Sequence, residues 1–549
     1  MLFFQKIQKL LSKKIGWLIP ILLIPAIWSL FVPGWGGLSD DMHVAWLHQM
    51  VQTFLAGKWP PRYVPDLSFG FGYPLFNFVF PMPFYLGSLF YFLGLTLVDS
   101  LKAVFGVSLV ASFASMYFLL KHLSNKWLAL IGAIVYVYTP YRATDVYVRG
   151  AVGESLAFVF FPLIVLAVLR AGKNIEWLGV GSLGVAGLIL SHNITAMMFI
   201  PLAFILALML KSNLKVYLLF LLGLLVSLYF WFPAIWDSKL MQYATVFDAK
   251  DHFPTIKQLI TPHFGWGASV PGPYDGMSFF LGLPNLLLMA LGAGLIITRK
   301  KTIGREKEIL LLWAMSLMAV SIFMMNYRSS ILWDNLPLLP YFQFPWRFLA
   351  LMAFASSLLA IFLKELKGGV WFGVILIVIA TLFGAKYFRF YKFNGWSDSF
   401  FLNRYIPVPE ASFEYHQTGE EYLRLPLGTN VRPDQNFPRF FSEQKMEVGN
   451  LIELNALEAK ATISSKEALV VSYNRYLFPG WRVYIDGQEV KIMAGEPYGQ
   501  IAFDVGFGTH QVEIVWRETR RNKILDFVSL FALVVSGWLV VHSKERNEK

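Results

Sequence analysis

Residues 16–33, GWLIPILLIPAIWSLFVP, contain no charged side chain, and segments of this kind decide the fold of the chain. About 20 apolar residues are needed for a helix to cross the roughly 30 Å hydrocarbon core of a membrane. Because that core holds no water, a crossing backbone must satisfy its own hydrogen bonds, as a helix does. The chain of 549 residues is 56% hydrophobic and 15% charged. This composition predicts a protein that crosses the membrane many times.

Hydropathy predicts about 12 membrane-spanning helices. The predicted spans are residues 16–33, 101–120, 127–141, 154–170, 175–191, 194–210, 215–235, 278–298, 308–326, 345–363, 370–388 and 524–542. A basic stretch precedes the first span, and no small-residue cleavage site follows it, which predicts an uncleaved signal anchor. The expected fold class is therefore a polytopic α-helical membrane protein in the cell membrane.

Basic residues between the spans predict the orientation, because loops rich in Lys and Arg stay in the cytoplasm. The doubtful segment is 73–97, which is hydrophobic enough to span but carries three prolines in its first half. If 73–97 does not cross, the basic clusters fall on the same side as the N-terminus. They lie at 121–126, 170–173, 211–215, 299–307, 364–367 and 544–546. We therefore expect 73–97 to be juxtamembrane and both termini to be cytoplasmic. The net charge of +12 then needs no nucleic-acid partner.

The segment 389–523 differs from the rest because it is polar and contains short alternating runs such as WRVYID and HQVEIVW. Alternation with a period of two, broken by Gly and Asp-Gly turns, is typical of antiparallel strands. We expect three parts: a membrane domain at 1–388 with its first outer loop at 34–100, an extracytoplasmic β-sandwich at 389–523, and a closing helix and tail at 524–549.

Several chemistries have no signature in the chain. Cysteine is absent, which excludes disulfides and thiolate metal sites. No Walker loop, GxSxG elbow or HExxH helix is present, so neither nucleotide hydrolysis nor proteolysis is indicated. A lipid-linked or ion-driven process is left.

The first polar candidates are Asp40 and Asp41, just past the first span. One of these carboxylates is a candidate general base. The alternative is that Ser39 or Asp40 caps a helix over 42–55, where acidic residues suit the helix dipole. His43 lies three residues after Asp40, near enough on a helix to share a site.

A second group comprises Arg142, Asp145, Arg149 and Glu154, in a short outer connection. The two arginines suit a phosphate or diphosphate, because a guanidinium matches its oxygens. A carboxylate at the membrane edge is costly unless it is used or paired. The alternative is an Arg–Glu ion pair that only holds the loop.

Two further places carry polar groups at the predicted outer face. His192 and Asn193 lie between two apolar runs, as candidates for binding sugar hydroxyls or phosphate, or as a hydrogen-bonded helix junction. Trp346 and Arg347 stand at the start of a span, where such residues are common anchors. Arg347 is nonetheless a candidate for a lipid phosphate, and Trp346 for stacking on a sugar.

Five stretches resemble known membrane families. Residues 39–87, 148–169, 190–198 and 343–349 resemble a membrane family labelled "pyruvoyl-tetrahydropterin synthase-related", and 476–490 resembles the C-terminal part of YfhO-like membrane proteins. The chain lacks the histidine cluster that a soluble pterin synthase needs for zinc. Both families are associated with the GT-C glycosyltransferase architecture.

The resemblance implies an outer-leaflet glycosyltransferase that takes a sugar from a polyprenyl-phosphate donor to a glycan, lipid or protein acceptor. It places the base at Asp40 or Asp41 and a second acid at Glu154, with Arg142, Arg149 and Arg347 on the donor phosphate. No cofactor is certain, and a divalent metal stays open. Two alternatives remain: a transporter or flippase of lipid-linked sugars, and a non-catalytic scaffold for envelope assembly.

Overall fold

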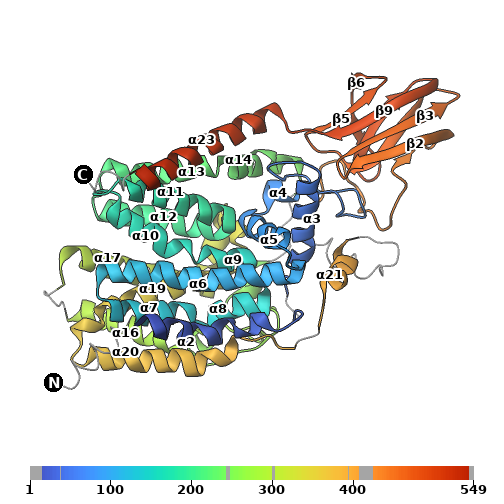
Figure 1. Cartoon of the computed structure of the whole chain (residues 1–549). Helices are drawn as coiled ribbons and strands as arrows, with labels where there is room; N and C mark the ends of the chain where they lie inside the picture. The colour runs from blue at the N-terminus through green and yellow to red at the C-terminus, as the bar shows by residue number, and fades with distance from the viewer. Residues whose placement is uncertain are drawn as a thin grey trace.

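The computed structural model describes residues 15–36, 39–242, 248–298, 303–392, 395–406 and 424–542. Its helices form an elongated bundle, and a β-domain lies at one end of that bundle (Figure 1). The start of α2 and the end of α23 both lie at the other end, away from the β-domain. The bundle helices are α2 (Ile15–Ile27), α6 (Leu97–Leu123), α7 (Lys126–Val137), α9 (Val152–Ala157), α10 (Phe160–Arg170), α11 (Glu176–Ser191), α12 (Asn193–Met209), α13 (Leu214–Val226), α14 (Leu228–Trp236), α16 (Leu283–Ile297), α17 (Arg305–Met324), α19 (Leu349–Leu358), α20 (Gly369–Val378) and α23 (Arg520–His542).

Six helical stretches of the described chain are long and apolar enough to cross a membrane, so this is a membrane protein. They are Leu97–Leu123, Val152–Arg170, Arg305–Met324, Pro345–Glu365, Gly369–Tyr387 and Arg520–His542. A seventh is the pair Leu214–Val226 and Leu228–Leu240, if the two helices, bent by 67°, make one span. The other five predicted spans hold shorter apolar helices, so the predicted number of about 12 spans is not confirmed.

The connections between the bundle helices carry shorter helices. One of these connections is the doubtful segment 73–97. That segment forms two helices, and Pro81 lies between them. A single helix does not run through it because proline removes a backbone donor and clashes with the preceding turn. Its juxtamembrane position stays a prediction. The shorter helices are α3 (His43–Leu55), α4 (Leu75–Phe78), α5 (Met82–Phe92), α8 (Pro140–Thr144), α15 (Ile256–Ile260), α18 (Ser330–Asn335) and α21 (Asp398–Tyr405).

The β-domain consists of two antiparallel sheets, in the orders β1-β4-β8-β7 and β2-β3-β9-β5-β6. The alternation seen in the sequence is the burial pattern: along β3, every second residue is buried. Ile463 and Ile514 of one sheet and Val471 and Phe503 of the other are fully buried. The strands are β1 (Phe440–Phe441), β2 (Met446–Asn455), β3 (Glu458–Ser465), β4 (Leu469–Tyr476), β5 (Trp481–Ile485), β6 (Gln488–Val490), β7 (Met493–Gly495), β8 (Gln500–Val505) and β9 (Gly508–Trp516).

The first loop, residues 34–100 between the first span and α6, contacts the β-domain. The hydroxyl of Tyr63 donates to the carbonyls of Phe71, at 2.7 Å, and of Tyr476 on β4, at 3.1 Å. Arg475 and Arg439 both donate to the carbonyl of Gly70, each at 2.7 Å. Because buried polar groups must be bonded, these contacts make the loop and the β-domain one packed unit.

Candidate functional site

Two of the predicted groups meet where the first loop pairs with the connection after α8. The amide of Asp40 donates to the carbonyl of Arg149 at 2.7 Å, and the amide of Ser39 donates to that of Val148 at 3.3 Å. Nδ1 of His43 donates to the carbonyl of Gly150 at 3.0 Å. Gly150 has a φ of +75°, a conformation that favours glycine. The acidic pair therefore lies beside the Arg–Glu connection.

A buried ion cluster lies next to this pairing and includes Arg149. Nη1 of Arg149 lies 2.7 Å from Asp145 and 2.8 Å from Glu154. The hydroxyl of Tyr141 donates to the other oxygen of Glu154 at 2.5 Å. Tyr141, Asp145 and Arg149 are four residues apart along one helical stretch, so they share a face. We use the term buried ion cluster for these four residues together with Arg347 and His192.

Arg347 brings the predicted groups at 192 and 343–349 into the same cluster. Its Nη1 lies 2.9 Å from Glu154 and 3.3 Å from Nε2 of His192, whose Nδ1 is bonded to Thr195 at 2.5 Å. Its Nη2 donates to Gln343 at 2.8 Å. Gln343 has a φ of +64°, which is strained for a residue other than glycine and is typical of functional sites. Glu154 is thus the shared acceptor of two arginines.

The two neighbouring aspartates have different environments. Asp41 is buried and accepts a hydrogen bond from the hydroxyl of Tyr405 on α21, and Arg404 lies 3.9 Å away. Burial raises the pKa of Asp41, although Tyr405 and Arg404 act in the opposite direction. The side chain of Asp40 is 34% exposed, and its Oδ2 lies 4.0 Å from Nη2 of Arg149. Asp40 is therefore the acid of the pair that stays open to a ligand.

The capping alternative for this pair is wrong. Helix α3 begins at His43, and its N-cap is Met42, which makes no side-chain cap hydrogen bond. The carbonyls of Asp40 and Asp41 accept the first helical amides instead, at 3.5 and 3.4 Å. Neither carboxylate is needed to start the helix.

Aromatic side chains cover the cluster. The Arg149 guanidinium lies 4.6 Å from the ring centre of Trp346, which is 2% exposed and stacks on Phe344 at 4.8 Å. Phe80 lies edge-on to His192 at 5.3 Å and to His43 at 6.5 Å. His43 is buried, and burial lowers its pKa. Trp346 is thus occupied by Arg149 rather than free for a sugar.

Two predicted site residues lie apart from the cluster contacts. Arg142 is fully buried, donates to the carbonyl of Ser155 at 2.9 Å and to Ser112 at 3.1 Å, and lies 4.1 Å from the ring centre of Phe158. Asn193 is partly buried, and its side chain accepts from the following amide at 3.1 Å. The Arg142 contacts join neighbouring helices and the Asn193 contact is local, so neither residue is included in the site proposed below.

Three residues that shape the site were not predicted from the sequence: Tyr141, Tyr405 and Phe80. The spacing of Tyr141, Asp145 and Arg149 was a readable signal for the first, because residues four apart share a helical face. Tyr405 is 364 residues from Asp41 in the chain, so no local pattern connects the two.

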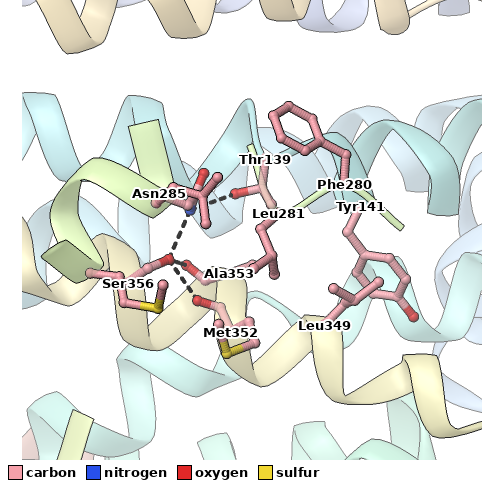
Figure 2. Close-up of a pocket in the computed structure, with 11 residues that line it drawn as sticks. Thr139, Tyr141, Phe280, Leu281, Asn285, Leu349, Met352, Ala353 and Ser356 are labelled. Atoms are coloured by element: carbon pink, nitrogen blue, oxygen red, sulfur yellow. Dashed lines mark hydrogen bonds between the residues drawn. The ribbon is translucent and has the colours of Figure 1, made fainter. Parts of the chain in front are cut away.

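A small cavity of about 10 Å³ lies next to Tyr141 of the cluster, and Thr139, Asn285 and Ser356 also line it (Figure 2). Asn285 donates to Ser356 at 2.8 Å and to Thr139 at 3.3 Å. This volume is about that of one water molecule, so no sugar fits there.

The described residues include no group of three or more His, Asp and Glu side chains arranged to hold a metal ion. Glu154, a buried carboxylate of the cluster, has its two oxygens bonded to Tyr141 and to the two arginines. The described residues of the cluster therefore offer no set of metal ligands, and whether a divalent metal is needed stays open.

Comparison with known proteins gives only distant likenesses. No protein-family model matches the chain, so the family labels suggested by its sequence are not confirmed, and no curated protein matches it either. Among solved structures, it is similar to ArnT from Cupriavidus metallidurans in the apo state, with a TM-score of 0.42, 14% identity, and 66% of this chain and 63% of that chain covered. It is also similar to the arabinofuranosyltransferase AftD from Mycobacteria, with a TM-score of 0.39, 14% identity, and coverages of 67% and 26%.

A third similar structure is the Archaeoglobus fulgidus oligosaccharyltransferase in complex with Zn and sulfate, with a TM-score of 0.32, 14% identity, and coverages of 73% and 56%. The chain thus spans less than two thirds of the length of each of these proteins. The chain is therefore a polytopic helical membrane protein with a domain of two antiparallel sheets before its last helix.

Proposed function

We propose that this protein is a membrane glycosyltransferase in which Asp40 is the general base. The observation that carries the proposal is the contrast between the two aspartates. Asp41 is buried and bonded to Tyr405, whereas Asp40 is 34% exposed and directly above Arg149. A base must be within reach of the proton that it removes. Of the two aspartates, only Asp40 is partly open to solvent, and its oxygens make only long contacts, with Ser39 at 3.4 Å and Arg149 at 4.0 Å.

The reaction that fits this site transfers a sugar from a polyprenyl-phosphate donor to a hydroxyl acceptor. Asp40 takes the proton from the acceptor hydroxyl, and the oxygen of that hydroxyl forms a bond to the anomeric carbon. The bond from that carbon to the phosphate oxygen breaks, and the phosphate leaves with the electron pair. Attack from the face opposite the leaving group inverts the anomeric centre.

Arg149 is the residue proposed to meet the donor phosphate. Its Nη1 is committed to Asp145 and Glu154, whereas its Nη2 faces Asp40 at 4.0 Å and is the nitrogen proposed to bind the phosphate. Both terminal nitrogens of Arg347 are bonded, one to Glu154 and the other to Gln343, so we assign Arg347 to positioning Glu154, and through it Arg149. The extracytoplasmic β-domain, docked on the same loop, is proposed to present the acceptor.

The test is sugar transfer by the purified full chain in lipid, with a panel of radiolabelled polyprenyl-phosphate sugars. Asp40→Asn keeps the shape of the side chain but removes its basicity, and we expect it to abolish transfer. The matched control is Asp41→Asn, which makes the same change one residue away and is expected to keep most of the turnover. Size-exclusion profiles of both variants check that they fold.

Loss of activity in Asp41→Asn with full activity in Asp40→Asn would reverse the assignment. Full activity in both would remove the base from this loop. The second variable is the donor: turnover of one polyprenyl-phosphate sugar and not the others would identify the sugar.

One observation favours a second candidate, the non-catalytic scaffold. In the buried ion cluster, Arg149 and Arg347 are balanced by Asp145 and Glu154, and Trp346 covers Arg149. A closed, charge-balanced cluster stabilises a fold without any ligand. Absence of both turnover and donor binding, for every sugar of the panel, would favour the scaffold over the transferase.

A further inference from the structure

A surface groove of about 220 Å³ lies where the chain passes from β9 into α23. Figure 1 shows this passage at the end of the bundle that meets the β-domain. Its walls are residues 57–60 of the first loop, residues 516–518 at the end of β9, and Lys523 in the first turn of α23. Three parts of the chain that are distant in sequence therefore build it. None of its lining residues belongs to the proposed catalytic site.

Three cations converge on this groove: Lys58, Arg517 and Lys523. Lys58 is partly buried, and Arg517 and Lys523 are exposed. Within the described ranges, none of the three side chains forms an ion pair. Burial and the nearby charge of Arg517 lower the pKa of Lys58, while Glu458 acts in the opposite direction. The carboxylate of Glu458 therefore offsets part of the positive charge at Lys58, and the three cations outnumber this one nearby acid.

The acid in the groove wall does not cancel this charge. Glu518 lies 2.8 Å from Nε of Arg62, which is itself buried. The other oxygen of Glu518 accepts from the side chain of Asn522 at 2.8 Å. Because the carboxylate of Glu518 is already paired with Arg62, the charges that an entering anion meets are those of the three cations.

The groove also lies beside a surface made for lipid. Ile524 and Phe527, next to Lys523 on α23, are 57% and 70% exposed, and α23 is one of the apolar membrane spans. On the opposite wall, Trp59 is 71% exposed and stacks on Tyr85 at a ring distance of 5.3 Å. Exposed Trp and basic residues at the end of a spanning helix are typical of the headgroup region of a membrane.

We propose that this groove binds the phosphate group of a membrane lipid. Lys58, Arg517 and Lys523 donate to the phosphate oxygens, the indole of Trp59 lies at the headgroup level, and the acyl chains lie along the exposed face of α23. Phosphate is the chemistry that the cations select, because ammonium and guanidinium groups bind its oxygens with charged hydrogen bonds. The inference does not depend on the proposed transferase activity.

The test counts lipids that stay bound to the delipidated full chain in detergent by native mass spectrometry. The titrants are phosphatidylglycerol, which is anionic, and phosphatidylcholine, whose headgroup has no net charge. The groove variant is Lys58→Gln/Arg517→Gln/Lys523→Gln. The matched control is Lys445→Gln/Lys466→Gln/Lys491→Gln, which removes three exposed basic charges of the β-domain outside the groove. Thermal unfolding of each variant checks the fold.

We expect the parent and the control variant to prefer phosphatidylglycerol, and the groove variant to lose on the order of a hundredfold in its affinity for that lipid. Equal affinity of the groove variant and the parent would overturn the proposal. If the triple variant fails to fold, Lys58→Gln and Lys523→Gln alone are each expected to weaken binding about fivefold, and no change in either would overturn it.

Glycerol 3-phosphate and inorganic phosphate distinguish the source of the phosphate. If either one binds as tightly as phosphatidylglycerol and is lost in the groove variant, the phosphate site is supported but its ligand is soluble. If neither one binds at lipid-like concentrations, the ligand is a lipid, and the acyl chains supply part of the affinity.

Discussion

Replacing Glu154 with Gln tests whether the buried ion cluster holds the bundle together. Glu154 is 1% exposed and accepts from Tyr141 at 2.5 Å, Arg149 at 2.8 Å and Arg347 at 2.9 Å. Glu154→Gln keeps the size of the side chain but leaves two buried guanidiniums with only Asp145 as a buried counter-charge. Removing one partner of a buried ion pair costs about 3–5 kcal/mol. We expect the free energy of unfolding to fall by that amount.

The measurement is reversible unfolding in mixed detergent micelles, followed by helical circular dichroism. The control is Glu453→Gln, which removes the same charge from an exposed pair with Arg439 at 2.8 Å. Exposed pairs contribute roughly 0.2–1 kcal/mol, so this control is expected to change little. A double variant with Arg347→Gln is expected to lose less than the sum of the two single losses, since it removes the unbalanced charge. A loss below about 1 kcal/mol for Glu154→Gln would refute the reasoning.

Two further predictions concern packing and pH. Gly153→Ala is expected to destabilise the protein by about 1–3 kcal/mol, because a Cβ there would lie 2.3 Å from the ring of Phe80. Gly106→Ala, whose Cβ would meet only Leu30 at 3.8 Å, is expected to be neutral or stabilising. Equal unfolding free energies for the two variants would contradict this prediction. Because burial raises the pKa of Asp41, its ionisation weakens the fold as pH rises from the ordinary carboxyl pKa towards the raised value. Asp41→Asn is therefore expected to gain stability relative to the parent as pH rises through that interval, and unfolding free energies measured from pH 4 to 7 that stay parallel would exclude the effect.

Local patterns in the sequence determined the class of structure. The apolar runs predict the helices, and all six long spans overlap a predicted segment, because burial in lipid demands apolar side chains over a continuous helical length. The alternation in 389–523 predicts antiparallel strands for the same local reason, since each strand turns every second side chain to the core. The number of spans was predicted less well, because helices such as α7 and α16 are apolar but short.

The candidate site was predicted as four separate groups, and their distances in the chain gave no means of joining them. Only the tertiary structure brings Asp40 onto the carbonyl of Arg149 and places Arg347 on Glu154, 193 residues away. The contrast between the two aspartates was likewise out of reach, because Asp41 is occupied by Tyr405 from α21. Burial and hydrogen bonding from distant segments set which carboxylate is free. The sequence by itself therefore determined which residues carry charge near the membrane surface, whereas the packing of distant helices decided which of those charges are paired and which one remains open.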